Sequence, residues 1–221
     1  MANKWDAVEM APADPILGVA IAYKQDPLPP SQKVNLGIGA YRDSEGNPLV
    51  LRCVREAEQK IAHDASMNKE YLPVEGLDRF LKNTSAVIFG KESSVIREGR
   101  VAVCQSLSGT GALRIAAEFI KAYHPTTQVY CSNPTWGNHH AIFKKAHLNT
   151  HTYRYLNKDM TLDIRGMLAD LAAAPMGSTF VLHTVAHNPT GVDPTPDQWK
   201  LIADVCIARD AIVLFDTAYQ G

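Results

Sequence analysis

A carboxylate and a phenol follow the last apolar run of the sequence. Residues 211–215 read Ala-Ile-Val-Leu-Phe, and Asp216 and Tyr219 come shortly after them. Such a run predicts a buried strand, and ligand sites in open α/β sheets lie where the strands end. A partly buried carboxylate is costly unless it has a partner. Asp216 has two interpretations. In the structural one it caps the next element or pairs with an arginine, and in the functional one it faces a cationic ring nitrogen of a ligand.

A turn rich in glycine and hydroxyl groups, SLSGTG at residues 106–111, joins a predicted strand to a predicted helix. Its glycines allow close approach to the backbone, and the helix start presents free N–H groups, so the turn predicts a phosphate cradle. An ordinary turn with hydroxyl caps is the structural alternative. Arg114 stands where a dinucleotide fingerprint needs its third glycine, which argues against a nicotinamide-dependent dehydrogenase.

Two further loops follow predicted strands. Trp136, within residues 132–139, is either a core residue or a flat face for an aromatic ring. Asn188 precedes Pro189, and a residue before proline is biased toward extended geometry, which would aim its amide at the same rim of the sheet.

Histidines and cysteines are the remaining reactive side chains. His139 and His183 are candidates for holding Asp216 in place. His183 and His187 have H-x-x-x-H spacing but fall across a strand end rather than on one helix, so we expect no metal site. The four cysteines stand singly and three lie in apolar runs, which indicates small buried hydrophobes and a reducing compartment.

Helical and strand patterns alternate from residue 49 onward. The expected helices cover residues 51–65, 77–89, 112–123, 138–147, 162–173 and 196–209, and the expected strands cover residues 101–104, 128–131, 151–155, 179–185 and 211–216. This alternation predicts βαβ units, an α/β fold and a largely parallel sheet. The polar clusters at the strand ends would then converge on one rim, where a ligand would sit.

Residues 1–48 have a different composition, with six prolines and room for one short helix near residues 17–24. Acidic residues near the start argue against a transit peptide, and the apolar centre that a secretory signal needs is not seen there. We therefore expect either a cytosolic protein or a mature N-terminus from which a presequence has been removed. A net charge of −1 offers no general attraction to nucleic acid. No apolar run approaches the roughly 20 residues of a membrane-spanning helix.

Six motifs, spread over nearly the whole chain, together resemble the aspartate aminotransferases of the class I pyridoxal-phosphate-dependent family. They are NLGIGAYR (35–42), EYLP (70–73), SGTGALR (108–114), NPTW (133–136), HNPTG (187–191) and DTAYQG (216–221). The resemblance implies the N-terminal portion of the family fold. Residues 1–48 would form an N-terminal arm and a small-domain segment, and residues 49–221 would form part of the large domain, with three layers and a mostly parallel sheet.

The resemblance also implies a compartment. Residues 8–18 and 136–139 look more like the mitochondrial form than the cytosolic form. The mitochondrial matrix is therefore expected, with the cytoplasm as the alternative.

Pyridoxal 5′-phosphate is the cofactor that the resemblance implies. Its phosphate would be held by Ser108, Gly109 and Thr110. Trp136 would stack on the pyridine ring, and Asn188 and Tyr219 would hydrogen-bond its phenolic oxygen. Asp216 would keep the pyridine nitrogen protonated, with His139 and His183 behind it, which makes the ring an electron sink.

Substrate and partner contacts follow from the same resemblance. Gly39 and Ile38 would line the pocket for the carboxylate of a small amino acid or 2-oxo acid, beside Trp136 and Asn188. Tyr71 would reach the cofactor phosphate of the neighbouring subunit, so a homodimer with shared active sites is expected.

The Schiff-base lysine of the family lies in a Ser-x-Ser-Lys-Asn stretch beyond Gly221, and no lysine of this sequence has a matching context. That lysine is both covalent anchor and general base. We therefore expect no transaminase activity from these residues alone. Two alternatives stay open: an aromatic or kynurenine aminotransferase, because the arginines that select substrate are also downstream, and a non-catalytic truncated isoform that binds a ligand or a partner subunit.

Overall fold

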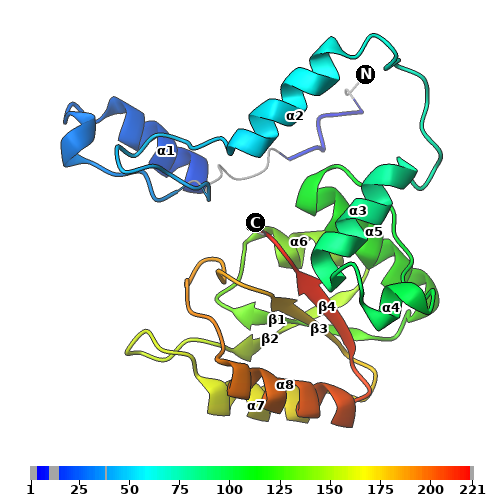
Figure 1. Cartoon of the computed structure of the whole chain (residues 1–221). Coiled ribbons are helices and arrows are strands. Elements are labelled where there is room, and N and C mark those ends of the chain that lie inside the picture. Colours follow the sequence, from blue (N-terminus) through cyan, green and yellow to red (C-terminus); the bar gives the residue numbers. More distant parts are fainter. Residues whose placement is uncertain (1–3, 10–14, 38, 220–221) are drawn as a thin grey trace. The chain divides into compact units, whose positions relative to one another are not determined.

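The computed structural model describes residues 4–9, 15–37 and 39–219. Contacts divide the chain into two compact units, Met1–Glu70 and Tyr71–Gly221, which we describe separately (Figure 1). The predicted domain boundary after residue 48 concerns the family's domains and stays a prediction.

The first unit contains two α-helices and a short 3-10 helix. They are α1 (Pro15–Gln25), η1 (Pro30–Gln32) and α2 (Arg52–His63). These bounds confirm the helices expected near residues 17–24 and 51–65. Within the described residues, α2 has no buried side chain.

The second unit is an α/β structure around a four-stranded parallel sheet. Its strands are β1 (Gln128–Asn133), β2 (Asn149–Arg154), β3 (Thr179–His183) and β4 (Ile212–Asp216), in the order β2-β1-β3-β4. Its helices are α3 (Asp78–Phe89), α4 (Ser94–Arg97), α5 (Ser108–Tyr123), α6 (Asn138–Lys145), α7 (Ile164–Ala173) and α8 (Pro196–Ala208). The α/β class and the parallel sheet are thereby confirmed.

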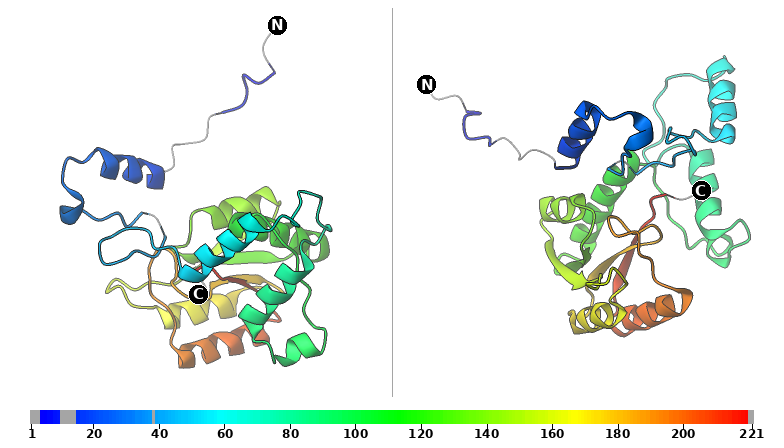
Figure 2. Two further views of the ribbon diagram at one scale, coloured as in Figure 1. Left: turned by 45° about the horizontal axis from the view of Figure 1, so that its top comes forward. Right: turned by 90° about the vertical axis from the view of Figure 1, so that its left-hand side faces the viewer.

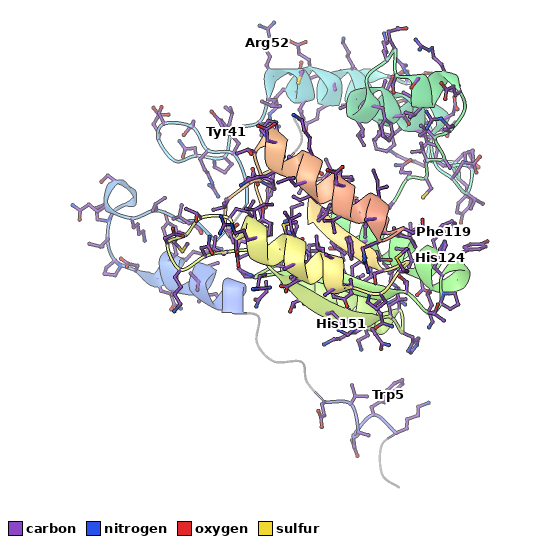
Figure 3. The ribbon with its side chains drawn as sticks, turned by 90° about the horizontal axis from the view of Figure 1, so that it is seen from below. Trp5, Tyr41, Arg52, Phe119, His124 and His151 are labelled. Carbon is purple, nitrogen blue, oxygen red and sulfur yellow. The ribbon has the colours of Figure 1, made fainter. Side chains whose placement is uncertain are left out.

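Helices cover both faces of this sheet and make three layers. Figure 2 shows α7 and α8 against one face and α5 and α6 against the other. β3 is buried throughout and alternates between the two cores: Val181 packs with α5 and α6, whereas Phe180 and Leu182 pack with α7 and α8. Phe119 lies on the outer side of α5 and is 61% exposed (Figure 3).

The strand expected over residues 101–104 is absent from the described sheet, and that prediction was wrong. A β-strand needs a hydrogen-bonded neighbour, and no strand of the described residues pairs with this segment. The segment lies beside α3 instead, and the two line a cavity of about 330 Å³. Cys104 is exposed in consequence, although an apolar run predicts a buried thiol.

Candidate functional site

A cavity of about 270 Å³ opens at the carboxyl ends of the strands, within the second unit. Eight residues named from the sequence line it: Ser108, Gly109, Thr110, Trp136, His183, Asn188, Asp216 and Tyr219. They come from four connections that follow residues 101–107, β1, β3 and β4. The rim predicted from the strand ends is therefore a single concave surface.

Of the remaining candidates, Tyr71 and the fully buried His139 are not among the residues that line this cavity. Tyr71 is fully exposed. Gly39 belongs to the first unit, whose placement relative to the second is not described. Ile38 lies outside the described residues.

The phosphate cradle predicted at residues 106–111 is the first turn of α5. The helix begins at Ser108, four residues before the expected start, and no side chain caps it. The first N–H groups of a helix lack partners within the helix and favour an anion. Ser108 and Tyr219 both hold left-handed backbone angles, with φ of 58° and 61°. For residues other than glycine this conformation costs on the order of 1–3 kcal/mol, and it concentrates at functional sites.

Asp216 ends β4 and provides the carboxylate of the cavity. Its Oδ2 accepts a hydrogen bond from Nε2 of the fully buried His139 at 2.8 Å. This bond lowers the pKa of Asp216 below its usual value, against the opposing effect of burial. The carboxylate is therefore ionised at neutral pH, which suits a cationic ligand group.

The hydrogen bonds behind Asp216 form a directed chain. The backbone N–H of Asn188 donates to Nδ1 of His183 at 3.1 Å. The proton of a neutral His183 must then be on Nε2, which donates to Thr135 Oγ1 at 3.2 Å. The Thr135 hydroxyl in turn donates to Nδ1 of His139 at 2.8 Å. His139 therefore carries its proton on Nε2, the nitrogen that faces Asp216.

Sequence reasoning missed Thr135. It links the two histidines that were named as supports for Asp216. Its position four residues before His139 was the available signal, because residues at this spacing meet at a helix start.

His187 extends this buried group without contacting Asp216. Its ring stacks on His183 with 4.1 Å between centroids and on Tyr155 with 3.7 Å. Its two nitrogens lie 2.8 Å from Ser132 Oγ and 2.8 Å from Thr190 Oγ1. Burial, followed by the neighbouring histidine, lowers the pKa of His183 to about 4 and that of His187 to about 3. Both rings are therefore neutral at pH 7.

The stability of the chain should depend on pH through these two histidines. Their pKa values lie below the unfolded value of 6.5, so the unfolded chain binds protons that the folded chain excludes. We expect the contribution of these two histidines to the free energy of unfolding to be fully present above about pH 6.5. It should be lost as the pH falls toward 4, by about 1.4 kcal/mol per pH unit for each histidine. Urea unfolding from about pH 7 to about pH 5 measures this slope.

His187→Gln is the matched variant for this measurement. It keeps a side chain that forms hydrogen bonds but removes one titrating group, so the slope should decrease by the share of one histidine. A free energy of unfolding that does not change between about pH 7 and about pH 5 would contradict the assignment of neutral rings.

No group of three or more metal-ligating side chains occurs among residues 4–9, 15–37 and 39–219. In this same part of the chain, none of the helices has the length and apolar character needed to cross a bilayer.

Comparison with known proteins places residues 31–221 within the family model "Aminotransferase class I and II". The mitochondrial aspartate aminotransferase of Dictyostelium discoideum is 49% identical over 220 residues, which are 99% of this chain and 51% of that protein. Other curated aspartate aminotransferases of similar identity have cytoplasmic and chloroplastic names. The chain spans about half the length of the curated relatives it matches.

Solved aminotransferase structures also match this chain over about half of their own length. The cytoplasmic aspartate aminotransferase of Saccharomyces cerevisiae aligns with a TM-score of 0.90 at 47% identity, covering 99% of this chain and 53% of that chain. An aromatic-amino-acid aminotransferase from Burkholderia pseudomallei, in a crystal structure described as covalently bound to pyridoxal phosphate, aligns with a TM-score of 0.92 at 39% identity and covers 99% and 54%.

Proposed function

Because the chain belongs to the class I and II aminotransferases, we propose that residues 71–221 form the pyridoxal-phosphate cradle of an aspartate aminotransferase. The observation that carries the proposal is the single cavity lined by the uncapped start of α5, Trp136 and the ionised Asp216. Aspartate is favoured over an aromatic substrate by the names of the curated relatives.

The residues present fit the chemistry of this cofactor. Pyridoxal phosphate combines an anion, a flat ring and a ring nitrogen that becomes cationic on protonation. The first turn of α5 suits the anion, the indole of Trp136 suits the ring, and the carboxylate of Asp216 suits the cation. The cavity volume of about 270 Å³ is close to the small end of ligand pockets, near 300 Å³.

The roles proposed for the individual side chains follow from this fit. Ser108, Gly109 and Thr110 bind the phosphate. Asn188 and Tyr219 hold the phenolic oxygen, and Asp216 holds a proton at the pyridine nitrogen. His139 donates to Asp216 and so keeps that carboxylate ionised and in place. When bound, the cofactor supplies the electron sink for amino-group transfer.

The proposed reaction also involves residues that do not line the cavity. We propose reversible transfer of the amino group between aspartate or glutamate and their 2-oxo acids. Gly39 and Ile38 would bind the substrate carboxylate with Trp136 and Asn188. Tyr71 would complete the neighbouring site in a homodimer, and its full exposure leaves it available for that contact.

The mitochondrial matrix is proposed as the compartment. The likeness of residues 8–18 and 136–139 to the mitochondrial form supports it, although residues 10–14 of the first motif lie outside the described chain. Relatives of similar identity have cytoplasmic and chloroplastic names as well.

These 221 residues are proposed to bind the cofactor without turning over substrate. No lysine is among the described residues that line the cavity, and the family reaction needs a lysine as anchor and base. Turnover of aspartate with 2-oxoglutarate should therefore stay at the non-enzymatic background of free pyridoxal phosphate. Turnover well above that background would refute this part of the proposal.

Titration of the chain with pyridoxal phosphate tests the cradle itself. Quenching of tryptophan fluorescence reports binding, and pyridoxal without its phosphate is the matched ligand. The charge-assisted bonds at the start of α5 should make pyridoxal phosphate bind about tenfold or more tightly than pyridoxal. Equal affinities would remove the support for a phosphate cradle at residues 108–110.

A further inference from the structure

One carboxylate, Asp193, holds the loop that follows β3. Its Oδ2 accepts the backbone N–H of Ala186 at 2.8 Å, and its Oδ1 accepts that of His187 at 2.9 Å. Ala186 adopts a left-handed φ of 51°, which a residue with a Cβ avoids unless the surroundings impose it. Two charge-assisted hydrogen bonds to adjacent N–H groups can stabilise that conformation. Asp193 therefore fixes the direction in which the backbone enters Asn188.

The next N–H along this backbone begins the hydrogen-bond chain behind Asp216. Asn188 donates its N–H to Nδ1 of His183, and a ring nitrogen that accepts a hydrogen bond cannot carry a proton. At the other end of the chain, the ionised Asp216 can only accept, so it independently requires the proton of His139 on Nε2. His183 donates to Thr135, Thr135 donates to His139, and His139 donates to Asp216.

A change in that first bond would reach His139. If the Asn188 N–H turned away, Nδ1 of His183 would be free to carry the proton, and Nε2 would become an acceptor toward Thr135. Thr135 could then donate to His183 instead of His139. Asp216 would still hold the proton of His139 on Nε2, but Nδ1 of His139 would lose the hydrogen bond from Thr135.

We propose that Asp193 is a positioning residue, which fixes the tautomer of His183 by aiming the Asn188 N–H at its Nδ1 and so keeps the Thr135 hydroxyl donating to His139. Asp193 contacts neither Asp216 nor the cavity, so it acts only through the backbone and the histidines. Any effect of Asp193 on a pyridine nitrogen bound at Asp216 rests on the proposed function. The tautomers themselves do not, and they are measurable without cofactor.

Nitrogen NMR of the 221-residue chain with ¹⁵N-labelled histidine tests the proposal, because protonated and unprotonated ring nitrogens have separate shifts. Single His183→Gln and His139→Gln variants assign the signals. In the unsubstituted chain, both histidines should show the pattern of a proton on Nε2. In Asp193→Ala, we expect His183 to lose that single pattern and show a proton shared with Nδ1, and the Nδ1 signal of His139 to shift as its hydrogen bond from Thr135 is lost.

Asp170→Ala is the matched control. Asp170 also accepts a backbone N–H, that of Arg154, and it pairs with the Arg154 guanidinium, and none of these three bonds involves a histidine. Removing it deletes a comparable set of bonds, so the His183 and His139 patterns should stay unchanged. A change of equal size in this variant would show that the effect is general loosening, and it would overturn the specific role of Asp193.

Two further outcomes would also overturn the proposal. They are a proton on Nδ1 of His183 in the unsubstituted chain, and unaltered His183 and His139 signals in Asp193→Ala. If Asp193→Ala does not fold, Asp193→Asn decides, because its amide oxygen can accept only one of the two N–H groups. The Asp193→Asn variant should shift the same signals in the same direction, and unchanged signals would again contradict the proposal. Failure of cofactor binding would leave these results untouched.

Discussion

Replacing Asp216 with asparagine is expected to weaken the binding of pyridoxal phosphate to the 221-residue chain about tenfold to a hundredfold. A hydrogen bond to a charged group contributes about 1.5–3 kcal/mol, and each 1.4 kcal/mol is a factor of ten in affinity. Asparagine keeps the shape of the side chain and an oxygen that can accept from His139. The loss should therefore report the missing charge, measured as the dissociation constant by tryptophan fluorescence.

Two controls make this result specific. Asp197→Asn removes an exposed carboxylate that pairs with Lys200 on α8, so it should leave the affinity unchanged. An analogue of the cofactor with carbon in place of the ring nitrogen should bind the unsubstituted chain and Asp216→Asn equally. If pyridoxal phosphate itself also binds both proteins equally, Asp216 does not face the ring nitrogen.

Replacing Phe180 with alanine should lower the free energy of unfolding by about 3–5 kcal/mol. Phe180 is fully buried in β3 and packs edge-on against Tyr130 at 5.9 Å. The substitution leaves a cavity between the sheet and α7 and α8, where the surrounding side chains can close it only in part. Because whole domains are stable by about 5–15 kcal/mol, the loss is a large fraction of the total. Urea unfolding measures it directly.

Phe119→Ala is the control for this measurement. The same ring is removed at a position that is 61% exposed, so the effect should be within about 0.5 kcal/mol apart from the contact with Tyr123. Equal losses in the two variants would mean that Phe180 does not belong to a close-packed core.

The elements from residue 128 onward follow closely from the sequence. Each predicted strand and helix in that part agrees with the structure to within two residues at either end. The reason is physical: each element buries one or both faces in a core, so its apolar spacing shows its type. The start of α5 was missed because serine, glycine and threonine favour turns over helices.

Pairing between distant segments is what the sequence could not show. Residues 101–104 have an apolar strand pattern but no neighbour in the described sheet, and only a neighbour turns such a segment into a strand. His139 and Asp216 are 77 positions apart, and their contact depends on how β1 and β4 lie in the sheet. Trp136, Asn188 and Tyr219 were found because they follow strands, whereas Ser108–Thr110 were found from their glycine and hydroxyl pattern. The roles of Thr135 and Asp193 appear only when the donors and acceptors are traced in three dimensions.

β4 combines two properties that are usually kept apart. It carries the carboxylate of the cavity at its end, and it is an outer strand of the described sheet, paired there only with β3 and with Phe215 about half exposed. A strand that paired with its open edge would restrain the backbone that holds Asp216. Edge pairing and ligand binding would then be thermodynamically linked, and each would raise the affinity of the other by the same factor.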